Sequence, residues 1–150
     1  MRRLIAWVAA AFAPAIIGLP FTARAPQYYR ALDKPGWSPP SSAFGPVWTV
    51  LYLLIGVSGW LVAQRTGSGG AQRLWGLQLA LNAAWTPLFF GLRRPGMALV
   101  EIMATLAAIV LTVAAFFRQR RLAGVLLLPY LAWVAFATAL NAAIWRRNRR

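Results

Sequence analysis

The 150-residue sequence contains no cysteine and no histidine, and its acidic residues are limited to Asp33 and Glu101. Without thiolate or imidazole groups, the usual zinc sites, cysteine nucleophiles and Ser-His-Asp triads are excluded, and we expect no metal site. The two carboxyl groups lie on different segments, so paired acid/base catalysis would require folding to bring them together. These absences argue against a conventional hydrolase or oxidoreductase.

Charge is also absent from four long windows, residues 4–22, 35–64, 74–92 and 122–145, while residues 95–117 carry only Glu101. A membrane-spanning helix needs about 20 mostly apolar residues. The sequence therefore predicts an all-α bundle of five transmembrane helices, at about 4–22, 42–63, 73–92, 95–117 and 122–145. No length remains for a soluble domain, so we expect one membrane domain, 1–150, in a multi-pass protein embedded in the lipid bilayer.

The first apolar window has two interpretations. Two N-terminal arginines, the apolar run and Ala23-Arg24-Ala25 imitate a secretory signal with its cleavage site. The run is longer than a normal signal core and contains Pro14 and Gly18, which suit a packed transmembrane helix. We favour the retained helix.

The net charge of +14 invites a nucleic-acid interpretation. The basic residues, however, lie in the gaps between the apolar windows, for example Arg93 and Arg94 or Arg118, Arg120 and Arg121. This placement is typical of anchors to anionic lipid head groups. We therefore expect no nucleic-acid partner.

The first gap, residues 23–41, is long and rich in aromatic residues and proline. Its run from Lys34 to Pro40 contains three prolines and cannot be helical. We expect a long first loop, either over one mouth of the bundle or as a surface linker with Trp37 at the head groups.

The third window predicts a helix with two different faces. At about 100° per residue, Gly76, Ala80 and Ala83 share one face. Small residues at this spacing let two membrane helices approach closely, so this face is a candidate homodimer seam, with packing inside the monomer as the alternative. Polar and aromatic residues lie on the opposite side, which we expect to point inward; they are Gln78, Asn82, Trp85 and Phe89.

Aromatic residues recur at helical spacing in the second and fifth windows as well. Trp48 and Tyr52 are four residues apart, and Trp133, Ala137, Leu140 and Asn141 follow one face. Singly, these aromatics suit core packing. Together with Asn82 and Trp85, they predict an interior cavity for a flat, apolar molecule with some polar character. The predicted ligand-binding residues are Trp48, Tyr52, Asn82, Trp85, Phe89, Trp133, Ala137 and Leu140.

Several runs resemble the TspO/MBR family (tryptophan-rich sensory protein/translocator protein) over nearly the whole chain. They are Lys34-Pro35 through Pro39-Pro40, Trp48-Thr49-Val50-Leu51-Tyr52, Asn82-Ala83-Ala84-Trp85-Thr86-Pro87-Leu88-Phe89-Phe90-Gly91, and Pro129-Tyr130-Leu131-Ala132-Trp133 through Leu140-Asn141. The resemblance implies five transmembrane helices, a homodimer, and a pocket beneath the first loop for porphyrins, sterols or benzodiazepine-type drugs. It places Trp48, Tyr52, Asn82, Trp85, Trp133 and Ala137 at pocket-lining positions.

The same resemblance matches Trp48 and Trp133 to tryptophans implicated in light-dependent porphyrin breakdown, so they would be the catalytic residues if such breakdown occurs. Two departures matter: Ala142 replaces the tyrosine of a proposed sterol motif, which lowers the sterol expectation, and Gly36 makes the loop looser. Abundant Arg and Ala favour a bacterial origin. Whether the inner or the outer membrane holds the protein is left open.

These inferences combine in one hypothesis. Protoporphyrin IX would stack on Trp48 and Trp133, with Asn82 reaching one of its polar groups. Basic residues of the first gap would meet the propionates; the candidates are Arg24, Arg30 and Lys34. Free-base porphyrin is favoured over haem, because the chain lacks the histidine that most often ligates haem iron, and no cofactor is required. The candidate functions are a tetrapyrrole sensor, which we prefer, a porphyrin or sterol transporter, and a photochemical enzyme.

Overall fold

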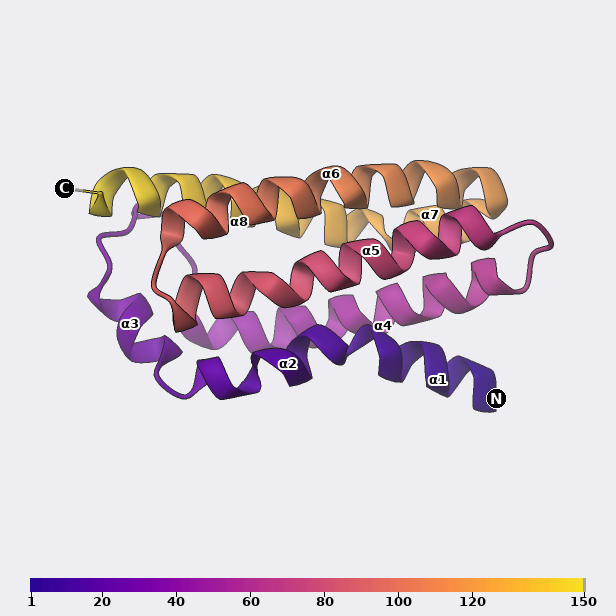
Figure 1. Ribbon diagram of the computed structural model, residues 1–150, viewed down its shortest axis with the longest axis horizontal. Helices are drawn as coiled ribbons and strands as arrows, with labels where there is room; N and C mark the ends of the chain where they lie inside the picture. Colours follow the sequence, from indigo (N-terminus) through magenta and orange to yellow (C-terminus); the bar gives the residue numbers. More distant parts are fainter. Residues whose placement is uncertain (150) are drawn as a thin grey trace.

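The computed structural model describes residues 1–149, and every regular element in this range is helical. In chain order the elements are α1 (Arg2–Ala11), α2 (Ala13–Thr22), α3 (Ala25–Ala31), η1 (Ser41–Ala43), α4 (Phe44–Ala63), α5 (Gly69–Thr86), η2 (Pro87–Gly91), α6 (Pro95–Gln119), α7 (Arg121–Leu126) and α8 (Leu128–Asn148). The long helices lie side by side along the longest axis of the molecule, as Figure 1 shows.

Four stretches are long and apolar enough to cross a membrane: Arg2–Thr22, Ser41–Ala63, Pro95–Gln119 and Arg121–Asn148. They agree with four of the five expected windows to within a few residues. The remaining window forms α5 and η2 but is not among these candidates. Its polar side chains, Gln72, Arg73, Gln78 and Asn82, make it less apolar than the others.

Prolines interrupt three of the long helices. Pro14 and Pro129 lie in the first turns of α2 and α8. They directly follow the short breaks that separate α1 from α2 and α7 from α8. Pro87 opens the π-helical turn η2, in which the Leu92 N–H bonds to the Pro87 carbonyl oxygen at 2.8 Å. A proline lacks the N–H that would continue the preceding turn, which explains each irregularity.

The first apolar segment packs closely onto α4. A methyl group at Gly56 would come within 2.5 Å of the Val8 Cα atom, so only glycine allows this approach. Next to it, the rings of Trp7 and Trp75 meet edge to face at 4.7 Å. Gly18 likewise lies against Thr86. The segment therefore packs as a helix of the bundle.

The first gap contains more helix than the sequence indicated. The expected loop at residues 23–41 includes α3, which begins next to Pro26, a favoured residue for a first helical turn. As expected, Lys34 to Pro40 are not helical. Ser38 closes a turn there, its backbone N–H bonding to the Pro35 carbonyl at 3.0 Å.

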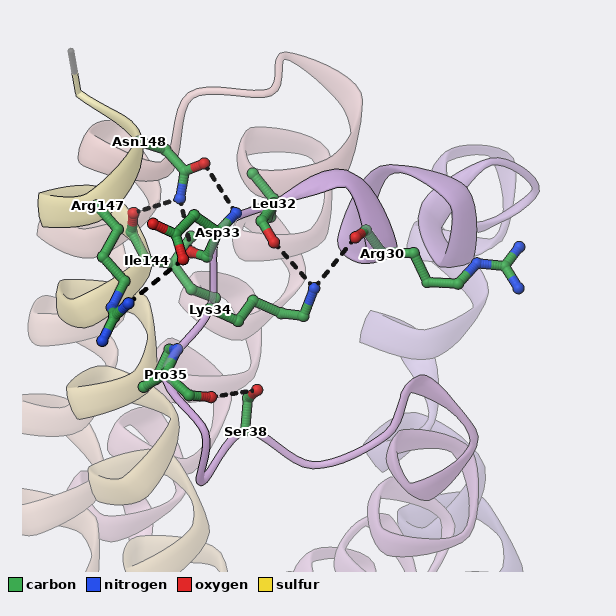
Figure 2. A network of polar contacts seen from close by, with 9 residues as sticks. All are labelled: Arg30, Leu32, Asp33, Lys34, Pro35, Ser38, Ile144, Arg147 and Asn148. Carbon is green, nitrogen blue, oxygen red and sulfur yellow. Dashed lines mark hydrogen bonds and ion pairs between the residues drawn. The ribbon is translucent and has the colours of Figure 1, made fainter.

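This non-helical run is fastened to the end of α8, as Figure 2 shows. The Asp33 N–H donates to Asn148 Oδ1 at 3.1 Å, and Asn148 Nδ2 donates to the Asp33 carbonyl at 2.9 Å. The Asp33 carboxylate also pairs with the Arg147 guanidinium at 3.3 Å. We call this set of contacts, made by Asp33, Arg147 and Asn148, the clasp. It joins residues 115 positions apart in the chain.

Candidate functional site

A cavity of about 380 Å³ lies among α2, α4, α5, α6 and α8, and α3 also contributes to its lining. Its volume is in the range of small-molecule sites, and most of its surface is apolar. Six of the eight predicted ligand-binding residues line it: Trp48, Tyr52, Asn82, Trp85, Trp133 and Ala137. Their binding role stays a prediction.

Aromatic rings form two of the cavity walls. On α4, Trp48 stacks on Tyr52 with ring centroids 5.3 Å apart, because residues four apart share one helix face. On α8, Trp133 meets the ring of Phe44 at 6.0 Å and that of Phe136 at 5.5 Å. Flat rings on facing helices leave a space suited to a planar molecule.

Asn82 is held by neighbouring side chains. Its Nδ2 donates to the Tyr130 hydroxyl at 2.8 Å, and that hydroxyl donates to Gln78 Oε1 at 2.7 Å. The Tyr52 hydroxyl in turn lies 3.4 Å from Asn82 Oδ1, to which it donates. This network joins α4, α5 and α8, so Asn82 fixes the walls of the cavity. The sequence placed Gln78 on the same face as Asn82 but did not indicate Tyr130 as the partner.

Asn141 does not accompany Trp133 in the cavity. Its Oδ1 accepts a hydrogen bond from Trp85 Nε1 at 3.0 Å, and its Nδ2 donates to the Pro95 carbonyl at 2.8 Å. Pro95 is the first residue of α6. Asn141 thus ties α5 to α8 and α8 to the start of α6.

Two predicted residues, Phe89 and Leu140, do not line the main cavity. Both are buried in a second cluster and border a separate void of about 30 Å³. Phe89 stacks on Trp85 with centroids 4.8 Å apart. In the π turn η2, which Pro87 opens, it is Phe90 and not Phe89 that lines the cavity.

The chain's two carboxyl groups are not brought together. Asp33 belongs to the exposed clasp, whereas Glu101 on α6 lines the cavity beside Thr105, whose hydroxyl donates to Glu101 Oε1. The other oxygen, Oε2, and Trp133 Nε1 are buried without a hydrogen-bond partner within residues 1–149. Glu101 was missed as a lining residue, although a lone acid in an apolar window is itself a signal.

The segment before α4 also contributes to the cavity. Tyr29 of α3 lines it and donates its hydroxyl hydrogen to the Pro39 carbonyl at 3.0 Å. Burial raises the pKa of this phenol above its usual value, so Tyr29 stays a neutral donor. Lys34, a candidate propionate partner, has its ammonium bonded to the Tyr29 and Leu32 carbonyls at 2.6 and 3.0 Å. The side chain of Arg30 points away from these residues (Figure 2).

The two faces of α5 differ in burial as the sequence suggested. Gln78 and Asn82 are buried, whereas Gly76 and Ala80 are exposed and Ala83 is half-buried. A methyl group at Gly76 would meet no atom within 4 Å. Gly76 and Ala80 are therefore not used for packing within the described chain.

Comparison with known proteins identifies the family. The family model described as "TspO/MBR family" matches residues 5–146. The chain belongs to the TspO/MBR family. It is 42% identical over 127 residues to the translocator protein of Homo sapiens, an alignment that covers 81% of this chain and 75% of the relative. It is 40% identical to the tryptophan-rich sensory protein of Cereibacter sphaeroides, with 96% and 90% covered.

A third TspO/MBR relative, the tryptophan-rich protein TspO of Archaeoglobus fulgidus, is 41% identical, with 97% of each chain covered. Membership in this family and the four long apolar helices show that the chain is an integral membrane protein. Because these relatives of similar identity come from different kinds of organism, the bacterial origin expected from composition stays a prediction.

Proposed function

We propose that this TspO/MBR member binds a tetrapyrrole, with protoporphyrin IX as the first candidate, in the cavity between Trp48 and Trp133, and that it acts as a sensor or regulator. The observation that carries the proposal is the cavity itself, about 380 Å³ in volume and walled by aromatic rings. A planar aromatic ligand gains about 0.5–1.5 kcal/mol per well-placed aromatic pair beyond the burial of its surface.

A five-span topology supports this function, because the cavity then lies within the membrane. In the chain, α4 precedes α5 and α6 follows η2. Both α4 and α6 belong to candidate spans. The connections are short, residues 64–68 and 92–94. A chain that leaves one end of α4 and enters α6 at the other end has to cross between them. In Figure 1, α5 runs beside α4 and α6 along the length of the bundle.

The ligand is proposed as free-base porphyrin, because no histidine is present to ligate haem iron. Sterols and benzodiazepine-type drugs are secondary candidates, since they are also flat or compact and apolar. The relatives are named sensory protein and translocator protein, so their names divide between sensing and transport. We prefer sensing, and transport is the alternative.

The decisive experiment is a titration of the purified protein with protoporphyrin IX in the dark. The quenching of tryptophan fluorescence measures the binding. Trp48→Phe and Trp133→Phe should each weaken the quenching, because each removes part of a wall. Trp60→Phe is the matched control, since Trp60 does not line the cavity and should leave the titration unchanged. Unchanged quenching in both wall variants would refute the site.

Two further measurements separate the alternative functions. A transporter would move porphyrin across proteoliposome membranes, whereas a sensor would bind it without flux. A photochemical enzyme would convert porphyrin to a new product under light and oxygen and would lose that product in Trp48→Phe or Trp133→Phe. Porphyrin itself absorbs the light, so this third function does not need acid/base residues.

We also propose that the protein forms a homodimer through the small-residue face of α5. Gly76 and Ala80 are exposed there, and their small size would let two backbones approach closely. This proposal is independent of the ligand, because the face lies opposite the buried polar side chains of α5.

A further inference from the structure

Two polar atoms at the cavity are buried without a partner: Glu101 Oε2 from α6 and Trp133 Nε1 from α8. A buried polar group that lacks a hydrogen bond costs free energy, and a carboxyl group in apolar surroundings costs more. One atom can accept a hydrogen bond and the other can only donate one. Two residues of the cavity lining, Glu101 and Trp133, therefore carry an unused acceptor and an unused donor.

Several other polar side chains at the cavity already bond to the protein. Asn82 bonds to Tyr52 and Tyr130, and the Trp85 N–H bonds to Asn141. The Thr105 hydroxyl is occupied by the other oxygen of Glu101. A ligand would break existing bonds to reach these groups, whereas Glu101 Oε2 and Trp133 Nε1 gain a bond without losing one.

The charge of the lining has one sign. Glu101 is the acidic residue in the lining, and no lysine or arginine of residues 1–149 lines the cavity. Arg30 follows the lining residue Tyr29 in the sequence but is not part of the lining. Lys34 is held by backbone carbonyls, as Figure 2 shows. The faces of Trp48 and Trp133 add to this preference, because aromatic rings attract cations.

We propose that the cavity selects flat aromatic molecules that place a protonated nitrogen or an N–H group at Glu101, and a hydrogen-bond acceptor at Trp133, and that it discriminates against anions. The inference rests on the proposed function only in taking the cavity as the ligand site. It assigns polar recognition to Glu101 and Trp133 instead of Asn82. A bound porphyrin would accordingly keep its propionates outside the cavity.

Three molecules of similar three-ring outline test this selectivity: the cation 9-aminoacridine, neutral anthracene and the anion 9-anthracenecarboxylate. Their binding is measured with the protein in phosphatidylcholine nanodiscs, with empty nanodiscs subtracted for partition into lipid. We expect the cation to bind about ten- to a hundredfold more tightly than the anion, the range of hydrogen bonds to charged groups. Glu101→Gln should remove most of this difference.

Asp33→Asn is the matched control, because it removes the chain's other carboxylate, which lies in the clasp outside the cavity. Its ranking of the three molecules should equal that of the original protein. Equal binding of cation and anion by the original protein would overturn the inference without need of any variant. A cation preference that survives in Glu101→Gln would overturn it too.

The proposed function fails in a different way. If neither protoporphyrin nor any of the three probes quenches tryptophan fluorescence, the cavity is not a ligand site and both ideas fall. If protoporphyrin binds through Trp48 and Trp133 but the three probes are not ranked by charge, the proposed function stands and only the selectivity is refuted.

Discussion

The indole N–H of Trp85 donates to Asn141 Oδ1 at 3.0 Å and so joins α5 to α8 across the bundle. The Nδ2 atom of Asn141 donates to the Pro95 carbonyl at the start of α6. Asn141 therefore connects the three long helices α5, α6 and α8. The Trp85 ring is thereby fixed against the cavity, which suits a supporting wall.

Replacing Asn141 by alanine should destabilise the protein by about 1–3 kcal/mol, because the Trp85 N–H and the Pro95 carbonyl each lose a partner. Thermal unfolding in detergent measures the effect. Thr138→Val on the same helix is the control, since the Thr138 hydroxyl bonds only to the Val134 carbonyl of its own helix. A loss in Asn141→Ala no larger than in the control would contradict a tertiary role for Asn141.

Tyr130→Phe should also lower stability, by about 1–3 kcal/mol, because it leaves Asn82 Nδ2 and Gln78 Oε1 buried without their shared partner. Tyr28→Phe provides the comparison, since Tyr28 lies outside this network on the short helix α3. Equilibrium unfolding in mixed micelles is the measurement. Equal stability of the two variants would show that the network contributes nothing.

Gly76→Leu combined with Ala80→Leu should shift the protein from dimer to monomer, since bulky side chains would hold the two α5 helices apart. The monomer should remain folded, because a Cβ atom added at Gly76 meets no atom within 4 Å and Ala80 is exposed. Crosslinking and light scattering in detergent report the state. Leu77→Ala, at an exposed neighbouring position, is the control. A dimer that persists in the double variant would refute this seam.

Asn148→Ala should open the clasp and speed hydrogen exchange at the Asp33 amide, which then loses its acceptor. Arg147→Ala should change exchange much less, because the Arg147–Asp33 ion pair is exposed, and such pairs contribute about 0–1 kcal/mol. Hydrogen exchange with mass spectrometry compares peptides that span residues 32–37. Equal rates in Asn148→Ala and the original protein would show that the clasp does not hold this run.

The positions of the helices could be read from the sequence because apolar windows free of charge have one stable arrangement in lipid. The short helix α3 was missed, because a helix of seven residues carries little periodic signal. The span expected at residues 73–92 was predicted from its lack of charge, but α5 is not among the four stretches that are apolar enough to cross a membrane. Helical periodicity assumes a regular helix, so it did not indicate that Phe90 of the π turn η2, and not Phe89, lines the cavity.

The sequence likewise predicted only part of the candidate site. Local periodicity predicted which faces of α4, α5 and α8 carry Trp48, Asn82 and Trp133, since side chains one turn apart share a face. It could not say that Asn82 bonds to Tyr130, because that pairing depends on how two helices distant in sequence are packed.

The sequence by itself determined an all-helical membrane protein of the TspO/MBR family and the helix faces that bear its aromatic residues. Only the tertiary structure decided which polar groups satisfy one another and which, on the cavity-lining residues Glu101 and Trp133, have no partner within residues 1–149. The reason is physical: hydropathy and periodicity act along one helix, whereas hydrogen bonds in the bundle form between helices and depend on their relative positions.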